Sequence, residues 1–189
     1  MIFISYHGGF HMNETLKSIM TRKSIRKFTD KPVADEEITT ILKAGMSGPS
    51  ACNCRPWSFI IVKDREMLNK MADAKKQYSD LIRKAAFAVL VCGDLERAIP
   101  NAPEYWVIDG SIAIENMILA AHSMGIGSCW VGIWPRRENM DPQAELFMLP
   151  ESAVPHSIVA FGYPEESEGF GTPREKPEWE ASQVHFEKW

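Results

Sequence analysis

Residues 109–132 read DGSIAIENMILAAHSMGIGSCWVG, and this stretch does most to decide the fold. Apolar side chains occupy nearly every face of its first part, which predicts a helix over 105–124 that is buried on most sides. Gly125 and Gly127 stop that helix, and the apolar run over 128–134 predicts a strand directly after it. A helix buried in this way needs other elements packed around it.

Helices and short strands are also predicted on both sides of this stretch. Capping residues and apolar periodicity predict helices that begin at Asn13, Asp35, Asp64 and Pro142. Apolar runs bounded by turn residues predict strands over 57–62, 85–92 and 156–163. Because helices of varied length separate the strands, the pattern suggests an α/β layered domain with a small central sheet.

The composition is that of an ordinary globular domain. The 189 residues are 45% apolar and 24% charged, which suits one domain with a substantial core. The net charge of -4 gives no general attraction to nucleic acid, and the absence of any run of 18 apolar residues predicts no membrane span. The four cysteines form neither a CxxC nor a paired zinc spacing, so a reducing cytoplasm is expected.

The chain divides into two unequal parts. Residues 1–12 are interpreted as an N-terminal arm or leader, because they lack the basic start of a signal peptide, and residues 13–189 as a single domain with a C-terminal extension. His7 and His11 are four apart, but the glycines between them disfavour a helix, so no metal site is expected. Several enzyme classes are disfavoured, because no GxSxG, Walker, HExxH or GxGxxG motif is present.

The most informative local feature is the basic segment RKSIRKF, defined here as residues 22–28. If the backbone is extended, the alternating Arg22, Ser24 and Arg26 share one face. Two guanidinium groups and a hydroxyl are suited to a dianionic phosphate. A basic run is more often a solvated surface, so this segment alone leaves both interpretations open.

Two further segments have a functional and a structural interpretation each. PSACNCRPW at 49–57 concentrates amides, a hydroxyl and a charge in one loop, although Pro49 and Pro56 also suit a rigid turn. In that loop, a redox role for Cys52 and Cys54 is possible in principle, with two reduced thiols as the alternative. GIGSCWVG at 125–132 offers glycines that permit close approach of a flat ligand, or merely a helix stop and a packed strand.

Together, and in this order, the three segments resemble the nitroreductase family of flavoproteins. The resemblance extends from Asn13 to Trp189 and includes LPESAVPHSIVAFGYP at 149–164 and PREKP at 173–177. It implies an α+β fold, a three-layer sandwich with a small central sheet. It further implies an interlocked homodimer with FMN at the interface between the subunits.

The resemblance also implies which residues bind the cofactor. Those expected at the FMN phosphate and pyrimidine edge are Arg22, Lys23, Ser24 and Arg26, joined at the phosphate by Arg174 and Lys176. Those expected from the opposite subunit are Pro49, Ser50 and Asn53, with Arg55 standing where many relatives carry Gln. Those expected to present their backbone to the isoalloxazine are Val131, Gly132 and Ile133, and some relatives carry an acidic residue in place of Gly132.

The implied activity is transfer of electrons from NAD(P)H to a small acceptor, such as a nitroaromatic or a quinone, in a ping-pong cycle. No catalytic side chain is expected, because the flavin N5 carries the chemistry. Two alternatives stay open: a specialised flavin reductase, dehalogenase or enone reductase on the same scaffold, and a flavin-binding protein without turnover. The aromatic residues of the C-terminal extension, Trp179, Phe186 and Trp189, favour a partner subunit that covers them.

Overall fold

The computed structural model describes residues 13–172 and 180–189. Four strands form one sheet in the order β1-β2-β4-β3, with bounds Trp57–Val62 for β1, Phe87–Asp94 for β2, Ala153–Gly162 for β4 and Gly127–Gly132 for β3. All three neighbouring pairs are antiparallel. The layered arrangement is therefore as the strand and helix pattern suggests, but the pairing makes the fold α+β, as the resemblance implies.

The connections explain why helices between strands do not produce a parallel sheet. Two helices rather than one connect β1 to β2, namely α3 (Arg65–Lys75) and α4 (Asp80–Lys84). The chain can therefore return to the end of the sheet where β1 stops and begin β2 there. A single long helix, α5 (Tyr105–Ser123), connects β2 to β3. These two strands run parallel but are not neighbours, because β4 lies between them.

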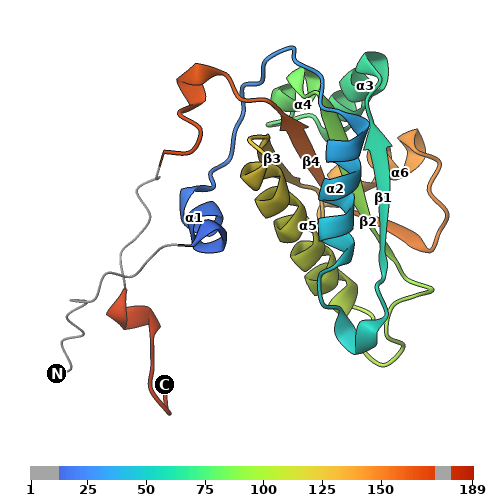
Figure 1. The fold of residues 1–189 in the computed structure, drawn as a ribbon. Coiled ribbons are helices and arrows are strands. Elements are labelled where there is room, and N and C mark those ends of the chain that lie inside the picture. The colour runs from blue at the N-terminus through green and yellow to red at the C-terminus, as the bar shows by residue number, and fades with distance from the viewer. Residues whose placement is uncertain (1–12, 173–179) are drawn as a thin grey trace, which may run out of the picture.

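The helices form two layers around the sheet (Figure 1). Helices α2 (Asp35–Met46) and α5 cover one face, and α3, α4 and α6 (Arg137–Leu146) cover the other. Along β2, odd-numbered residues such as Val89 belong to the core beside α5, and even-numbered residues such as Leu90 belong to the core beside α3. This alternation is what a strand buried on both faces requires.

Most predicted elements are confirmed, with shifts at their ends. Helix α1 (Glu14–Thr21) is capped by Asn13, and α5 is buried along most of its length. The prediction that a helix begins at Pro142 is wrong, because α6 begins at Arg137 and contains Pro142 in its interior. The five-residue α4 is too short to produce a recognisable apolar period and was not predicted.

A pair of glycines attaches the basic segment 22–28 to the sheet. Gly127 of β3 and Gly162 of β4 lie opposite each other in the strand register. A Cβ atom on Gly127 would meet Ile25 at 2.9 Å, and one on Gly162 would meet the Phe28 ring at 2.9 Å. Ile25 and Phe28 are therefore buried in space that only glycine leaves free, and they hold the cations between and beside them in place.

We expect Gly127→Ala to lower the free energy of unfolding by about 1–3 kcal/mol, because the new methyl group must displace Ile25. The matched control is Gly132→Ala on the same strand, where a Cβ meets nothing within 4 Å and should change stability by less than about 0.5 kcal/mol. Urea unfolding of both variants measures the difference. Equal stability of the two variants would contradict this account of the glycine pair.

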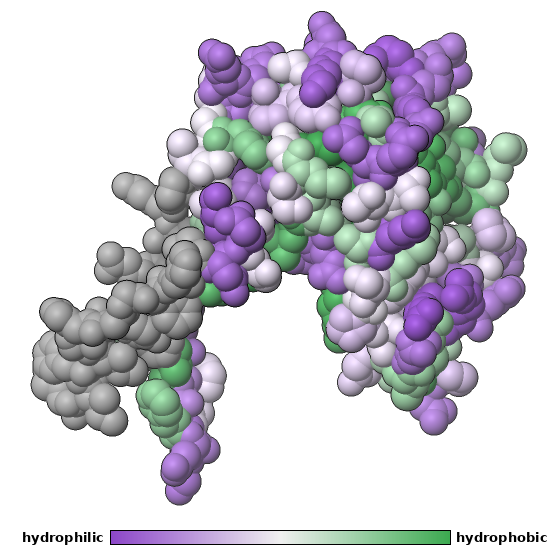
Figure 2. Space-filling view, in the orientation of Figure 1, coloured by the Kyte–Doolittle hydropathy of each residue, from purple (hydrophilic) through white to green (hydrophobic). Residues whose placement is uncertain are grey.

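The C-terminal segment 180–189 stands apart from the layered body (Figures 1 and 2). Its side chains at Phe186 and Trp189 are 83% and fully exposed, and the Trp189 ring stacks on His185, at 4.3 Å between centroids. Trp179 lies outside the described residues. Among the helices that the structure describes, none combines the length and the apolar character needed to cross a lipid bilayer.

Candidate functional site

A cavity of about 660 Å³ opens beside the edge strand β3. Three residues expected at the cofactor line it: Arg26, Val131 and Gly132. Its other lining residues come from the basic segment, from the connection between α3 and α4, from β3 and from the start of α6; they are Lys27, Lys75, Tyr78, Asp80, Leu81, Cys129, Trp130 and Arg136. Four of the lining side chains are cationic and one is acidic, so the cavity favours a negatively charged occupant.

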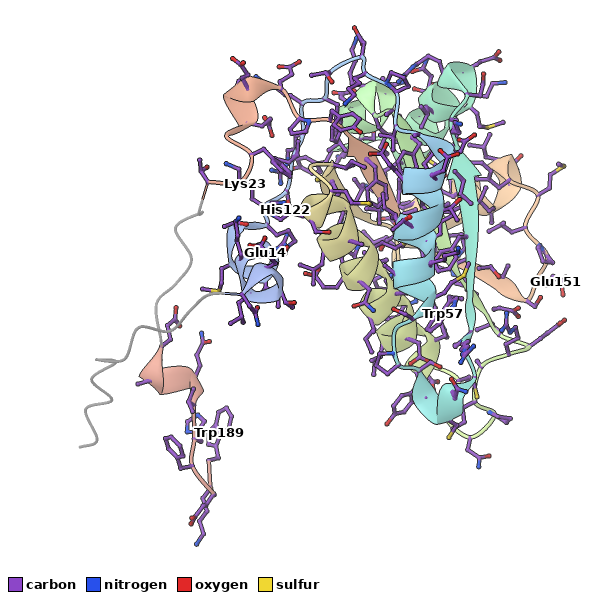
Figure 3. All side chains as sticks on the ribbon, in the orientation of Figure 1. Glu14, Lys23, Trp57, His122, Glu151 and Trp189 are labelled. Carbon is purple, nitrogen blue, oxygen red and sulfur yellow. The ribbon has the colours of Figure 1, made fainter. Side chains whose placement is uncertain are left out.

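The basic segment distributes its cations to different surroundings. Arg22 forms an ion pair with Glu115 of α5, with 3.5 Å between Nε and Oε1. Lys23 points toward the late turn, where its Nζ donates to Thr172 Oγ1 at 3.2 Å (Figure 3). Arg26 lines the cavity, and its backbone N–H donates to Glu168 at 2.9 Å.

The strand β3 offers backbone groups at the edge of the sheet. Ser24 forms a parallel bridge with Ser128, and beyond that bridge the outer edge of β3 has no strand partner among the described residues. At Gly132 no atom lies within 4 Å of the position that a Cβ would take. A flat group can therefore approach the backbone of Val131 and Gly132 closely. Ile133 is buried, and its N–H donates to the His156 carbonyl at 3.3 Å.

The loop over 49–55 adopts backbone conformations that L residues rarely take. Cys52, Asn53 and Arg55 all have φ near +50°, at 49°, 56° and 52°. Side chains of the loop support it, since Ser50 Oγ accepts from the Arg55 N–H at 2.9 Å and Asn53 Oδ1 accepts from Arg55 Nε at 2.9 Å. Such strain persists only where the surroundings fix it, and it is concentrated at functional sites.

The carboxylate of the buried Asp109 in α5 forms a hydrogen bond with the backbone of this loop. Its Oδ1 accepts from the Ala51 N–H at 3.0 Å, and its Oδ2 is buried without a hydrogen-bond partner among the described residues. Sequence reasoning did not single out Asp109, because an acidic residue near the start of a predicted helix is usually exposed. The loop 49–55 does not line the cavity that Arg26 lines, so one chain alone does not bring all the predicted residues together.

Several residues of the cavity were not predicted. Lys75, Tyr78 and Arg136 line it beside Arg26, although they lie far from the basic segment in the sequence. Burial lowers the pKa of Lys75, and the nearby charge of Arg136 lowers it further, whereas Glu138 opposes the shift. Two of the predicted phosphate contacts, Arg174 and Lys176, lie outside the described residues.

The thiols are free wherever they occur in the chain. Burial raises the pKa of Cys129 on the cavity wall, although the charge of Arg26 and the Ser24 hydroxyl oppose the shift. Burial also raises the pKa of Cys92 to about 12. Cys52 is exposed and Cys54 half-buried. Within residues 13–172 and 180–189, no cluster of three His, Cys, Asp or Glu side chains is arranged to hold a metal ion.

A chain of hydrogen bonds connects Trp130 of β3, through β4, to helix α5. Trp130 Nε1 donates to Ser157 Oγ at 2.7 Å, and Ser157 Oγ lies 2.9 Å from His156 Nδ1. His156 Nε2 lies 3.0 Å from the Val107 carbonyl, which can only accept. Nε2 therefore carries a proton, and in the neutral ring Nδ1 accepts from the Ser157 hydroxyl. Burial lowers the pKa of His156, and the Val107 carbonyl only partly offsets this.

This lowered pKa predicts a loss of stability in acid. Below the ordinary pKa of 6.5, the unfolded chain protonates at His156 while the folded chain resists, so folding stability declines as the pH falls. His156→Gln should be less stable at neutral pH and should show a smaller decline between about pH 7 and pH 5. Urea unfolding across this range measures it, with His185→Gln in the exposed tail as the control. An equal decline in all three proteins would contradict the assignment.

Comparison with known proteins shows the family to which the chain belongs. The model of the family described as "Nitroreductase family" matches residues 19–91 and 73–163. The chain belongs to the nitroreductase family. An Archaeoglobus fulgidus protein described as a provisional NADH dehydrogenase/NAD(P)H nitroreductase is 43% identical over 182 residues, covering 94% of this chain and 100% of the relative.

Solved structures of nitroreductase-family proteins share the fold. One from Parabacteroides distasonis, with the same provisional description, is 37% identical with a TM-score of 0.84, covering 94% of this chain and 99% of that one. The NADPH:FMN oxidoreductase of Vibrio harveyi, solved with NAD+, is 28% identical with a TM-score of 0.81, covering 94% of this chain and 78% of that one. The α+β fold is therefore confirmed, and with it the membership that the three segments predict.

Proposed function

We propose that this nitroreductase-family protein binds FMN and passes electrons from NAD(P)H to a small acceptor. The observation that carries the proposal is the cationic cavity beside the open backbone of Gly132. It supplies the two things a flavin ring requires, a flat approach along a strand edge and positive charge near its pyrimidine side. The names of relatives, which include an FMN reductase of Bacillus subtilis, support the choice of FMN.

The residues present fit this cofactor in their chemistry. Arg22, Lys23 and Ser24 would hold the phosphate, since guanidinium, ammonium and hydroxyl groups all donate to phosphate oxygens. Arg26, on the cavity wall, would face the pyrimidine edge, and the backbone of Val131 and Gly132 would lie against the ring. When bound, FMN supplies a centre that accepts a hydride and later returns the electrons, so no acid–base pair is required of the chain.

A single cavity favours a ping-pong cycle. Nicotinamide and acceptor would use the same opening in turn, which makes a separate dinucleotide-binding module unnecessary. The wall formed by Trp130 and Val131 would exclude water from the ring, with Val131 buried in the core. The specialised flavin reactions on the same scaffold use the same first half-reaction and differ only in the acceptor.

We expect NADH or NADPH to bleach the flavin absorbance of the FMN-loaded protein with no acceptor present, because the two half-reactions are separate. Anaerobic stopped-flow mixing with each nicotinamide measures this. A later addition of a nitroaromatic or a quinone should restore the absorbance. Bound flavin that no nicotinamide reduces would instead favour the flavin-binding protein without turnover, and reduction only in the presence of acceptor would overturn the ping-pong cycle.

We also propose that the working unit is a homodimer in which the loop 49–55 serves the cavity of the other subunit. Pro49, Ser50, Asn53 and Arg55 belong to a loop whose strained backbone at Asn53 and Arg55 is supported by hydrogen bonds to Ser50 and Asn53. None of the four lines the cavity beside β3 of its own subunit, although Arg55 borders a separate groove. The exposed aromatic side chains of Phe186 and Trp189 would gain about 1.5–3 kcal/mol each from burial against a partner. A groove along the edge strand β1, bordered by Arg55 and Arg97, gives that partner an apolar surface with positive charge at its rim.

Subunit complementation tests the shared site. Two variants are needed. Arg26→Glu disrupts the cavity, and the double variant Ser50→Ala with Asn53→Ala disrupts the loop. A homodimer of either variant should bind FMN roughly tenfold more weakly or worse. A mixed dimer, isolated through two different affinity tags, combines one intact cavity with the intact loop of its partner and should regain tight FMN binding at that site. Ultrafiltration with flavin absorbance measures the recovery.

The matched control pairs the cavity variant with Lys17→Ala, a change in the exposed ion pair with Glu14 on α1. A mixed dimer of one Arg26→Glu subunit and one Lys17→Ala subunit has one intact cavity and two intact loops. It should therefore keep one intact FMN site, whichever subunit's loop serves that cavity. Failure of the loop and cavity variants to complement, or a flavin-loaded monomer in sedimentation, would overturn the proposal.

A further inference from the structure

Lys75 is a buried cation that no ion pair among the described residues neutralises, although the charge of Glu138 acts on it. Its side chain is only 7% exposed, and its Nζ donates to the Gln77 carbonyl at 3.1 Å. None of the ion pairs among the described residues includes Lys75. A buried ammonium in such surroundings is unfavourable unless a negative group comes to it.

Arg136 adds a second cation at the same corner of the cavity. It is exposed, it lines the cavity with Lys75, and its charge acts on Lys75 strongly enough to lower that residue's pKa. Helix α6 begins at the next residue, so the positive end of its dipole strengthens the potential there. The one acidic side chain on the cavity wall, Asp80, is already engaged by Arg83, with 3.5 Å between Oδ1 and Nε.

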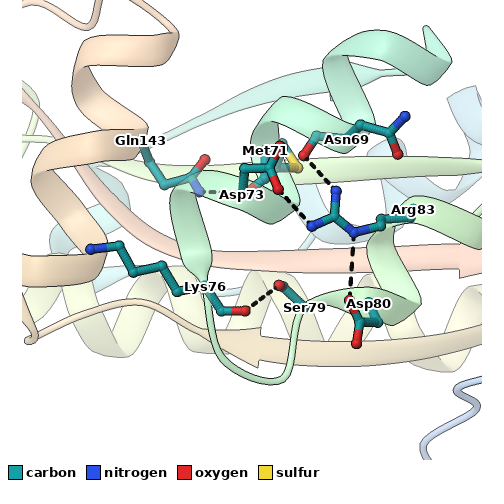
Figure 4. A network of polar contacts seen from close by, with 8 residues as sticks. All are labelled: Asn69, Met71, Asp73, Lys76, Ser79, Asp80, Arg83 and Gln143. Atoms are coloured by element: carbon teal, nitrogen blue, oxygen red, sulfur yellow. Dashed lines mark hydrogen bonds and ion pairs between the residues drawn. The ribbon is translucent and has the colours of Figure 1, made fainter.

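A network of polar contacts connects α3, α4 and α6, the helices next to the two cations (Figure 4). In the turn after Lys75, Lys76 and Tyr78 have positive φ values of 65° and 59°, and Ser79 Oγ donates to the Lys76 carbonyl at 2.6 Å. Arg83 ties α4 to α3 through Asp73 at 2.6 Å and the Asn69 carbonyl at 3.2 Å.

The buried Gln143 ties α6 to α3. Its Nε2 donates to the Met71 carbonyl at 2.8 Å, which joins the helix that starts beside Arg136 to the helix that ends with Lys75. The backbone positions at which the two cations are attached are thus fixed relative to each other by packed helices. Two cations attached to fixed elements are better suited to recognition of one anionic group than cations on mobile loops are.

We propose that Lys75 and Arg136 form an anion-recognition corner that selects acceptors carrying a carboxylate or sulfonate. The inference rests on the proposed function and names its substrate class. Arg26 and the open backbone at Gly132 are assigned to the flavin, which leaves three cations on the cavity wall. Lys27 follows Arg26 in the basic segment, whereas Lys75 and Arg136 come from the end of α3 and from the start of α6, so these two are the cations assigned to the second molecule that enters. The absence of a side chain at Gly132 means that no acidic group opposes an anion there.

The test compares two acceptors of the same shape, para-nitrobenzoate and para-nitrobenzamide. The measured quantity is the ratio of kcat/KM for the anion to that for the amide, and comparing variant with wild type cancels the intrinsic reactivity of each acceptor. Lys75→Gln should lower the ratio roughly tenfold and the more exposed Arg136→Gln roughly threefold. The matched control is Arg137→Gln, which removes the same charge one residue away, from an exposed ion pair with Asp141 outside the cavity, and should leave the ratio unchanged.

Equilibrium binding gives a second readout that needs no turnover. Titration of the FMN-loaded protein with benzoate and with benzamide, followed through the flavin absorbance, should show the same order of preference and the same losses in the variants. The preference for benzoate should also weaken as salt is added, since the pair is partly screened. If Lys75→Gln fails to fold, Arg136→Gln at the exposed rim still decides the outcome.

Three results would overturn the proposal. One is an unchanged ratio in both variants, and another is an equal loss in the Arg137→Gln control. The third is a change in the preference between NADPH and NADH in the reductive half-reaction instead, which would assign the two cations to the phosphates of the donor. Failure of the proposed function itself is distinct, because a flavin that no nicotinamide reduces stops turnover while the benzoate titration continues to report on the corner.

Discussion

The contact of Ile25 and Phe28 with two paired glycines is the constraint on which the rest of the site depends. A run of cations has no tendency of its own to lie against a sheet, and it would otherwise remain in solvent. Gly127 and Gly162 leave room for the two apolar side chains, and the Ile25 N–H then donates to the Ser128 carbonyl at 2.8 Å. The burial of Ile25 and Phe28 therefore fixes the positions of the charged residues next to them in the basic segment.

Helix α5 connects the separate parts of the site along its length. Near its start, Asp109 holds the loop through the Ala51 N–H; farther along, Glu115 pairs with Arg22. Near its end, His122 lies 2.8 Å from Thr21 Oγ1 and packs against the Phe170 ring at 4.6 Å (Figure 3). One helix thus connects the strained loop, the basic segment and the late turn, and it is held in place by the burial of Ile114, Met117 and Ile118 against α2 and the sheet.

The sequence could predict what depends on local chemistry and on the order of segments. Apolar periodicity placed α5 and the strands correctly, and the three ordered segments indicated the family. What it could not predict depends on tertiary contacts. The start of α6 at Arg137 is stabilised by the burial of Met140 and Gln143, and this burial outweighs the preference of Pro142 for a first turn.

The same limit applies to the site. Arg26 and Gly132 carry recognisable motifs, and they do line the cavity. Lys75 looks like an ordinary lysine at the end of an amphipathic helix, where a positive charge favours the helix dipole, and nothing in its neighbours marks it as buried. Its burial follows from the way the chain turns after α3 and packs α6 across it, which is a property of the fold alone.

The strained residues gather where the chain would meet its ligands. Of the seven non-glycine residues with positive φ that the structure describes, five belong to two turns, Cys52, Asn53 and Arg55 in one and Lys76 and Tyr78 in the other. Each such conformation costs on the order of 1 kcal/mol, and each turn is supported by its own buried or paired group, Asp109 for the first and Arg83 for the second. Strain that was merely tolerated would be scattered among loops. Its concentration in one turn that borders the cationic cavity, and in another that lies outside that cavity, indicates that both turns are held in shape for contacts beyond those within a single chain.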